Sequence, residues 1–292
     1  MRVFVAGASG AMGGRLLPLL VSAGHSVVGL TRIPARAESI RRVGAEATIA
    51  DALNRAANDL RRVERSFTLT NRLRTEGLQN LLAVARQTGT PRIVAQSFCG
   101  WPYARAGGPV KSEEDPLDPE PPRELRRTLE AIRYLERTVT DSSEIDGVVL
   151  RYGAFYGRGT GLFDGPLIDQ LRRRRVPLIG NANGWWSFLR VDDAAAATAV
   201  AAERGAAGIY NIVDDEPAPV REWLPALAAA LGARPPRHIP KWLARIGAGA
   251  HIVAMMTEAR AGSNAKAKRE LLWQPAHPSW RQGFTEVLVR CI

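Results

Sequence analysis

The stretch VFVAGASGAMGGR, residues 3–15, places a short apolar run before three glycines, and a helical pattern follows. The glycines are Gly7, Gly10 and Gly13. A strand, a glycine-rich turn and a helix in this order let backbone N–H groups meet a pyrophosphate. The first glycine permits the tight turn, the second the approach of the phosphate, and the third close packing of the helix. The pattern predicts a dinucleotide-binding turn, with a plain turn between two core elements as the alternative.

Strands and helices alternate along the first half of the chain. Apolar runs predict strands over residues 2–6, 26–31, 46–50, 92–97 and 147–151, and helical periodicity predicts helices over 11–23, 35–43, 71–87 and 123–140. Strands separated by helices of this length are typical of a parallel sheet with helices on both faces. We therefore expect an α/β fold with a Rossmann-type, doubly wound parallel sheet.

The second half of the chain differs in composition. Segments rich in proline and glycine separate short elements, and after Asp214 the pattern is mostly helical. Two further strands are expected over 187–191 and 208–213. We expect residues 1–151 with 187–213 to form an NAD(P)-binding Rossmann domain. Residues 152–186 with 214–292 should form a smaller, mainly helical substrate-binding lobe.

The composition disfavours several classes of protein. The 292 residues carry a net charge of +11, but only four of the 40 basic residues are lysines, and the arginines are scattered without interleaved aromatic residues. An anionic small ligand is therefore favoured over a nucleic acid. Neither a signal peptide nor a membrane span is recognisable. Cys99 and Cys291 have no paired spacing, so we expect a cytoplasmic protein without a disulfide framework or metal site. A homodimer is left open.

The end of the second expected strand favours NADP over NAD. An acidic residue there would bind the ribose of NAD, whereas an arginine accommodates the 2′-phosphate of NADP. The chain has Thr31 and Arg32 at this point, Arg36 one turn later, and no carboxylate before Glu38. We expect Arg32 to bind the phosphate, the alternative being a solvated surface charge.

Further segments resemble those of the extended short-chain dehydrogenase/reductases of the NAD-dependent epimerase/dehydratase kind. They are VAQSFCGWPY (94–103), VVLRYGAFYGRG (148–159), SFLRVDDAAAA (187–197), GIYNIVDDEP (208–217) and AKRELLWQP (267–275). The resemblance also implies that Asp51 caps the third strand and faces adenine. With the glycine turn and the arginine segment, it implies cofactor contacts from Gly7, Ser9, Gly10, Ala11, Met12, Gly13, Thr31, Arg32, Arg36, Asp51, Ala52, Tyr152 and Phe155.

The chain departs from this family at the catalytic pair. The family uses Tyr-x-x-x-Lys, in which a tyrosinate moves the hydroxyl proton and a lysine lowers the tyrosine pKa. None of the five tyrosines here has a lysine four positions later. With Glu136 as the anchor, Thr128 and Ile132 fall at the two positions, and such acid–base help is worth about a hundred- to ten-thousandfold in rate. The chain therefore resembles the atypical branch of the family.

The second departure is the short segment between Asp51 and Asn71. The family fits a helix and a fourth, apolar strand here, whereas this segment has almost no apolar run and a helix over 53–63 would nearly exhaust it. We expect the fourth strand to be missing, or reduced to a stub near Ser66–Leu69. The sheet would then have a gap beside the first strand, or the later strands would close up against it.

The remaining candidate residues follow the fourth predicted strand. Ser97 could polarise a substrate oxygen or cap the strand end, and Tyr103 could donate a proton or pack in its loop. Cys99 is expected to be a buried thiol. Trp185 and Trp186 could wall a substrate pocket or pack in the core.

Two classes of function are compatible with these features. The first is an NADP-dependent oxidoreductase or epimerase-like enzyme that transfers hydride to a small carbonyl, alcohol or sugar-nucleotide substrate, with Ser97 and Tyr103 in catalysis. The alternative is an NADP-binding sensor or partner-binding protein without turnover, which the missing Tyr-x-x-x-Lys favours. An RNA-binding relative would rest on charge alone.

Overall fold

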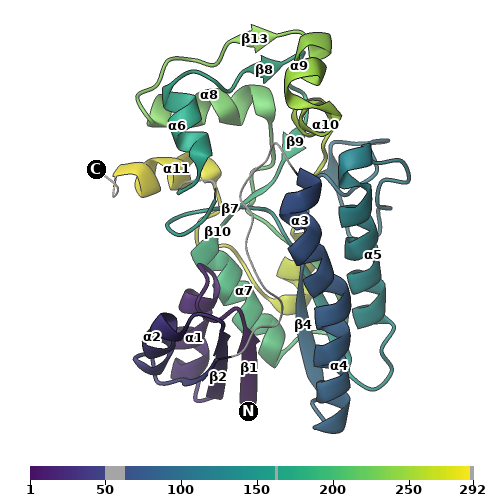
Figure 1. The fold of residues 1–292 in the computed structure, drawn as a ribbon, viewed down its shortest axis with the longest axis vertical. Helices are drawn as coiled ribbons and strands as arrows, with labels where there is room; N and C mark the ends of the chain where they lie inside the picture. Colours follow the sequence, from purple (N-terminus) through teal and green to yellow (C-terminus); the bar gives the residue numbers. More distant parts are fainter. Residues whose placement is uncertain (50–62, 162–163, 290–292) are drawn as a thin grey trace.

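The computed structural model describes residues 1–49, 63–161 and 164–289, and it has two lobes (Figure 1). One lobe contains two three-stranded parallel sheets and their covering helices. The other contains most of the chain after residue 153 and is mainly helical, with short strand pairs. The nucleotide-binding turn expected from the sequence lies in the first lobe, at the start of α1.

The first strands form a parallel sheet in the order β1-β2-β3. Strand β1 (Arg2–Ala6) pairs with β2 (Ser26–Thr31), which pairs with β3 (Glu46–Ile49). Helix α1 (Gly13–Ser22) crosses between the first two strands, and α2 (Ala37–Arg41), preceded by the 3₁₀ turn η1 (Pro34–Arg36), crosses between the next two. Leucines on the buried face of α1 pack with valines of β1 and β2 and with Ile40, which fixes the helix against the sheet.

A second parallel sheet has the order β11-β6-β4. Strand β6 (Asp146–Tyr152) lies between β4 (Arg92–Phe98) and β11 (Gly208–Ile212). Val149 packs with apolar residues of α4 (Leu78–Gln87) and α5 (Arg126–Thr140). Its neighbours Val148 and Leu150 pack with alanines of α7 (Val191–Glu203). Because successive side chains in a strand point to opposite faces, β6 is covered by helices on both sides, as the doubly wound expectation required.

Among the described residues, no hydrogen-bonded pairing joins the two sheets. Of the two arrangements expected from the short segment, the described strands fit the one with a gap. Phe4, on β1, is 51% exposed, which is unusual for the first strand of such a fold. Residues 52–62, where most of the expected helix over 53–63 would lie, fall outside the described residues.

Of the two alternatives for the fourth strand, missing or reduced to a stub near Ser66–Leu69, the stub is wrong, because these residues lie in helix α3 (Val63–Arg72). Helix α3 continues through the π-helical turn η3 (Leu73–Gly77) into α4, and the three form one long helix beside α5 (Figure 1). The Phe and Thr residues of the segment have β propensity, but packing against α5 outweighs this local preference.

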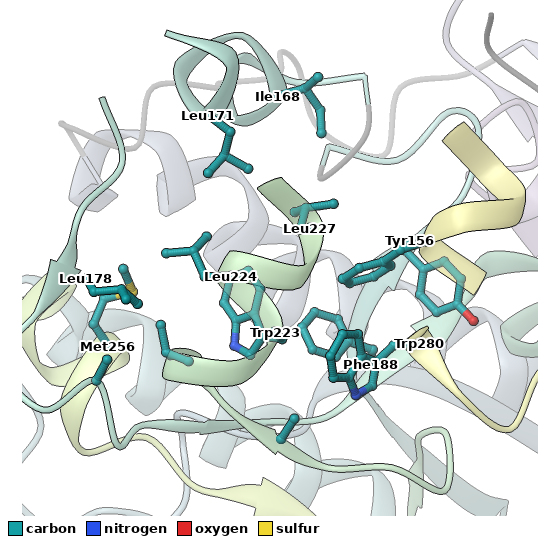
Figure 2. Packing of buried hydrophobic residues seen from close by; sticks show 14 of the residues in the cluster. Tyr156, Ile168, Leu171, Leu178, Phe188, Trp223, Leu224, Leu227, Met256 and Trp280 are labelled. Atoms are coloured by element: carbon teal, nitrogen blue, oxygen red, sulfur yellow. The ribbon is translucent and has the colours of Figure 1, made fainter. Parts of the chain in front are cut away.

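The second lobe is organised around its own core. Its helices are α6 (Pro166–Arg172), α8 (Val220–Ala230), α9 (Lys241–Ala248), α10 (Ala250–Thr257) and α11 (Trp280–Val289). Figure 2 shows Trp223, Leu224 and Leu227 of α8 packed among Phe188, Trp280 and Tyr156. Phe188, which the sequence assigns to the nucleotide-binding lobe, is fully buried in this second core.

Short elements complete the chain. They are β5 (Val110–Lys111), η4 (Arg123–Leu125), β7 (Ala154–Tyr156), β8 (Leu178–Ile179), β9 (Trp185–Trp186), β10 (Phe188–Arg190), β12 (Ala218–Pro219), β13 (His238–Ile239), β14 (Ala261–Gly262) and the π turn η5 (Ala267–Leu271). Over the described ranges, none of the helices has both the length and the apolar character that crossing a bilayer demands.

Candidate active site

The glycine turn after β1 has the shape of a backbone cradle. Gly7 has a φ of +79°, a conformation that side chains disfavour, and its carbonyl accepts a hydrogen bond from Gly10 N at 2.9 Å. A Cβ added at Gly13 would lie 2.4 Å from the Gly7 carbonyl oxygen. Only glycine at position 13 therefore lets α1 begin so close to the end of the strand.

The start of α1 offers unpaired donors. Within the described ranges, neither the backbone N–H of Ala11 nor that of Met12 has a protein acceptor. The first turn of α1 contains no acidic side chain that would occupy this end of the helix. Free N–H groups and the positive end of the helix dipole together favour an anion, such as a pyrophosphate.

The predicted ribose end of the cofactor site lies at the end of β2. The Ser9 and Thr31 hydroxyl oxygens are 2.9 Å apart, and the Arg36 guanidinium donates to the Ser9 carbonyl at 3.3 Å. Arg32 follows Thr31 directly and is exposed. The structure thus brings Ser9, Thr31 and Arg36 together, with the charge of Arg32 beside them.

The other expected cofactor residues have different positions. Asp51 and Ala52 lie outside the described residues. Tyr152 is 2% exposed, and its hydroxyl is 2.6 Å from that of Thr198, which in turn lies 3.8 Å from the sulfur of Met12. Tyr152 is therefore linked through Thr198 to Met12, which follows the glycine turn. The half-buried Phe155 packs against it, with 5.3 Å between the ring centroids.

Ser97 and Tyr103 belong to one buried network. The Ser97 hydroxyl donates to Glu136 Oε1 at 2.6 Å. Arg151 donates to both Glu136 oxygens and, through Nη1, to the Tyr103 hydroxyl at 3.0 Å. That hydroxyl donates in turn to Asn211 Oδ1 at 2.7 Å. The network ties the ends of β4, β6 and β11 to α5.

Burial controls the acidity of this region. Desolvation raises the pKa of the Tyr103 hydroxyl, which makes it a poorer proton donor than a free tyrosine. Desolvation also raises the pKa of the Cys99 thiol, which is therefore neutral. The catalytic roles of Ser97 and Tyr103 stay predictions, and their contacts favour a positioning role for both.

Thr128 and Ile132, which the sequence predicts at the positions of the family's tyrosine and lysine, lie on the buried face of α5. Thr128 and Ile132 are 2% and 1% exposed. The Thr128 hydroxyl accepts a hydrogen bond from Asn71 Nδ2 at 3.2 Å, and the side-chain Oδ1 of Asn71 accepts from Arg74 Nη1 at 3.4 Å. Desolvation lowers the pKa of Arg74 to about 10, against the opposing effect of the Glu136 charge. A cation from η3 is thus linked through Asn71 to Thr128, the expected position of the family's tyrosine.

A narrow hollow lies beyond the end of β4, where the two lobes meet. The cavity has a volume of about 30 Å³, within about 310 Å³ of empty space that includes open solvent, and its lining includes Phe98, Trp101, Trp185, Trp186, Met255 and Ala259. In open α/β sheets, ligands bind beyond the carboxyl ends of the strands. This hollow is therefore the candidate substrate site.

The segment from Ala154 to Gly159 connects the hollow with the glycine turn. Ala154 lines the hollow. A Cβ added at Gly159 would lie 3.1 Å from Ala11 Cβ, and Arg15 Nη2 donates to the Arg158 carbonyl at 2.9 Å. The five Cα-to-Cα steps from Ala154 to Gly159 span at most about 18 Å. The hollow thus lies within reach of a dinucleotide bound at the turn.

Sequence reasoning missed several of these residues. The sequence pattern identifies Asn71 and Arg74 only as part of a helix. It does not distinguish Phe98 and Met255 as site residues, because apolar residues occur throughout a core. The π-helical turn that holds Arg74 is a feature often found at functional sites, but it is not visible in the sequence.

Comparison with known proteins agrees with this geometry. The model of a family described as "NAD dependent epimerase/dehydratase family" matches residues 3–213. The chain belongs to this family. The matched region begins in β1, the strand before the glycine turn, and extends to the end of β11. The match indicates an oxidoreductase or epimerase-like protein.

Similar proteins cover nearly the whole chain. A Streptomyces protein, 3-diazoavenalumate denitrifying reductase, is 40% identical over 97% of this chain and 99% of its own length. Among solved structures, human epimerase family protein SDR39U1 with NADPH has a TM-score of 0.71 at 21% identity, covering 99% of each chain. DesIV, a dTDP-glucose 4,6-dehydratase from Streptomyces venezuelae with NAD and TYD bound, has a TM-score of 0.75 at 19% identity, covering 99% and 96%. The two structures support the Rossmann-type fold of the epimerase/dehydratase family.

Proposed function

We propose that this chain is an NADPH-dependent reductase that delivers hydride to a small electrophile bound between the two lobes. The observation that carries the proposal is the glycine turn, whose free N–H groups at Ala11 and Met12 lie at the start of α1. The 40% identical relative is named a reductase, which favours reduction over epimerisation.

The residues around the turn fit a phosphorylated dinucleotide. Ala11 and Met12 N–H would hold the pyrophosphate, and Arg32, with Arg36 beside it, would hold the 2′-phosphate of NADP. No carboxylate stands between Thr31 and Arg36 to bind the free ribose hydroxyl of NAD. We therefore place NADP above NAD as the cofactor.

The α5 positions restrict the reaction. Reduction of a carbonyl, or oxidation of an alcohol, moves a proton at oxygen, and neither Thr128 nor Ile132 can supply it at neutral pH. The Tyr103 hydroxyl is engaged with Arg151 and Asn211. A substrate that accepts hydride without protonation of an oxygen fits this site better than a sugar nucleotide or a ketone.

A diazo group on a ring, protonated to a diazonium, is such an acceptor, and the name of the 40% identical reductase describes denitrification of a diazo compound. When bound, NADPH would supply a hydride, and hydride addition at the terminal nitrogen of the diazonium would give an aryl diazene. Loss of N₂ from the diazene would leave a C–H bond whose hydrogen comes from the diazene N–H, which exchanges with water. Together, a diazonium ion and NADPH would give an arene, N₂ and NADP⁺, which balances the two electrons. The protein needs only to hold the reactants close together and exclude water.

The test uses NADPH deuterated at the hydride position with a benzenediazonium salt. We expect the protein to catalyse NADPH oxidation above the rate without protein, with one N₂ released per NADPH and a slower rate for the deuterated cofactor. The Gly10→Val variant is the control, because a Cβ at this position would lie 3.2 Å from the Gly7 carbonyl oxygen, in the turn proposed to hold the pyrophosphate. Equal rates with and without protein, or NADPH oxidation without N₂ release, would contradict the proposal.

An NADP-binding sensor without turnover is the competing function, since the missing tyrosine and lysine favour it. Saturable NADPH binding, with no oxidation of NADPH by diazonium, aldehyde or sugar-nucleotide substrates, would establish the sensor instead.

A further inference from the structure

We propose that the hollow between the two lobes binds a flat, apolar ring, so that the substrate of this protein is an aromatic compound rather than a sugar nucleotide. The inference deepens the proposed function and rests on it for the reaction. The chemistry of the side chains that line the hollow supports it.

Ser187 and Trp186, two of the polar residues that line the hollow, already have hydrogen-bond partners. Ser187 Oγ accepts from Gly262 N at 3.0 Å and donates to the Gly262 carbonyl at 3.1 Å. Trp186 Nε1 donates to the Met255 carbonyl at 3.0 Å. Burial raises the pKa of the Cys99 thiol and keeps it neutral. These groups have little left to offer a hydroxyl or phosphate on a ligand.

Charge is also missing from the described walls of the hollow. None of the described residues that line it is acidic or basic. A sugar nucleotide carries a diphosphate and many hydroxyl groups, and each would lose hydrogen bonds to water here without replacement. An apolar ring loses none and gains contact with the walls. The hollow therefore selects for the ring.

The aromatic walls are held in place by their neighbours. The Trp186 ring lies 5.0 Å from the Trp223 ring and 6.3 Å from the Phe188 ring, measured between centroids. Trp223 and Phe188 are both part of the buried core in Figure 2. On the other wall, the Phe98 and Trp101 rings are 6.2 Å apart at an angle of 41°. Rings fixed in this way favour a flat partner, because stacked and edge-on contacts need parallel or perpendicular planes.

All three tryptophans that line the hollow are partly open to water, and Trp186 also packs against the second core. Trp101 and Trp185 are half-buried, whereas Trp242 on α9 is 66% exposed and does not line the hollow. A ring that enters the hollow removes Trp101 and Trp185 from solvent and leaves Trp242 unchanged. Trp242 is therefore a matched control for substitution of a tryptophan.

The test is calorimetric titration of the full chain with p-hydroxycinnamate and with UDP-glucose, each with and without NADP⁺. We expect saturable binding of p-hydroxycinnamate and none of UDP-glucose. Trp185→Leu and Trp101→Leu should each raise the dissociation constant of p-hydroxycinnamate by roughly tenfold or more. Trp242→Leu should raise it by less than about twofold. Circular dichroism confirms folding, and either hollow variant suffices if the other fails to fold.

Three results would overturn the inference. They are tighter binding of UDP-glucose than of p-hydroxycinnamate, no saturable binding of the aromatic ligand, and an equal loss of affinity for that ligand in the Trp185 and Trp242 variants. Failure of the proposed function is distinguishable, because absence of NADPH oxidation leaves the titration without NADP⁺ unaffected. Reductase activity without aromatic binding would retain the function and reject the ring site.

Discussion

Arg151 holds Glu136 with two hydrogen bonds, from Nε to Oε1 at 2.8 Å and from Nη2 to Oε2 at 2.6 Å. The two side chains are 4% and 6% exposed, so this bidentate pair lies in the interior. It fastens α5 to β6, and Ser97 on β4 donates to the same carboxylate. The carboxyl ends of two strands that frame the candidate site are thus held by one acidic residue.

Loss of this carboxylate charge should destabilise the whole domain. Glu136→Gln leaves the Arg151 charge buried without its counterion, and we expect a loss of about 3–5 kcal/mol in the free energy of unfolding, measured by urea denaturation. Glu130→Gln, at an exposed position of the same helix, is the control. A difference between the two variants below about 0.5 kcal/mol would reject this role for the pair.

Two adjacent glycines should respond in opposite ways to alanine. A Cβ at Gly13 would meet the Gly7 carbonyl oxygen at 2.4 Å, whereas a Cβ at Gly14 has no neighbour within 4 Å. We expect Gly13→Ala to lower the melting temperature and to weaken NADPH binding by about tenfold or more. Gly14→Ala should keep binding and gain roughly 0.5–1 kcal/mol of stability from its higher helix propensity. Similar NADPH affinities for the two variants would show that the turn does not hold the cofactor.

The cofactor preference should depend on Arg32. Arg32→Asp removes the proposed partner of the 2′-phosphate and adds a repelling charge, so the dissociation constant of NADPH should rise by roughly tenfold or more while that of NADH changes little. Arg42→Asp makes the same change of charge at an exposed position beyond α2. Equal weakening of NADPH and NADH, or an equal effect of the Arg42 variant, would remove Arg32 from the site.

Asp214 should make stability depend on pH. Desolvation, with a smaller contribution from the Glu216 and Asp215 charges, raises the pKa of this buried carboxyl from 3.8 to about 8. The folded state therefore holds a proton that the unfolded state releases. The stabilisation is complete below about pH 4 and is lost as the pH rises through about 8.

The measurement compares urea denaturation of the natural chain and of Asp214→Asn at pH values from 5 to 9. The variant should lack this loss and should be the more stable protein at high pH by an amount on the order of a few kcal/mol. Glu114→Gln, at an exposed position, is the control. Parallel pH profiles for the natural chain and the Asp214 variant would show that the carboxyl is not protonated in the fold.

Strand positions could be predicted closely because they follow from local patterns. Residues 2–6 and 26–31 form β1 and β2 with the predicted bounds, and the strand predicted over 92–97 is extended by one residue. Ser66–Leu69 show where this reasoning fails. Their residue types suit a strand, but the segment continues into a helical run that packs along α5, and the sequence does not reveal that neighbour.

The sequence alone determined the glycine turn, because the strand, the turn and the helix that build it are contiguous and their conformations depend on backbone sterics. Thr31 and Arg32 follow from the same local logic, since the end of a strand is visible in its apolar pattern.

Only the tertiary structure decided what lies around the substrate position. Asn71 meets Thr128 across 57 residues, and the Trp186 indole meets the Met255 carbonyl across 69. Contacts of this kind depend on which faces pack together, and burial then sets whether a hydroxyl such as that of Tyr103 is free or engaged. The class of ligand that the site can bind follows from these long-range contacts. Water is excluded, and polar groups are paired, only where the two lobes pack against each other in the folded protein.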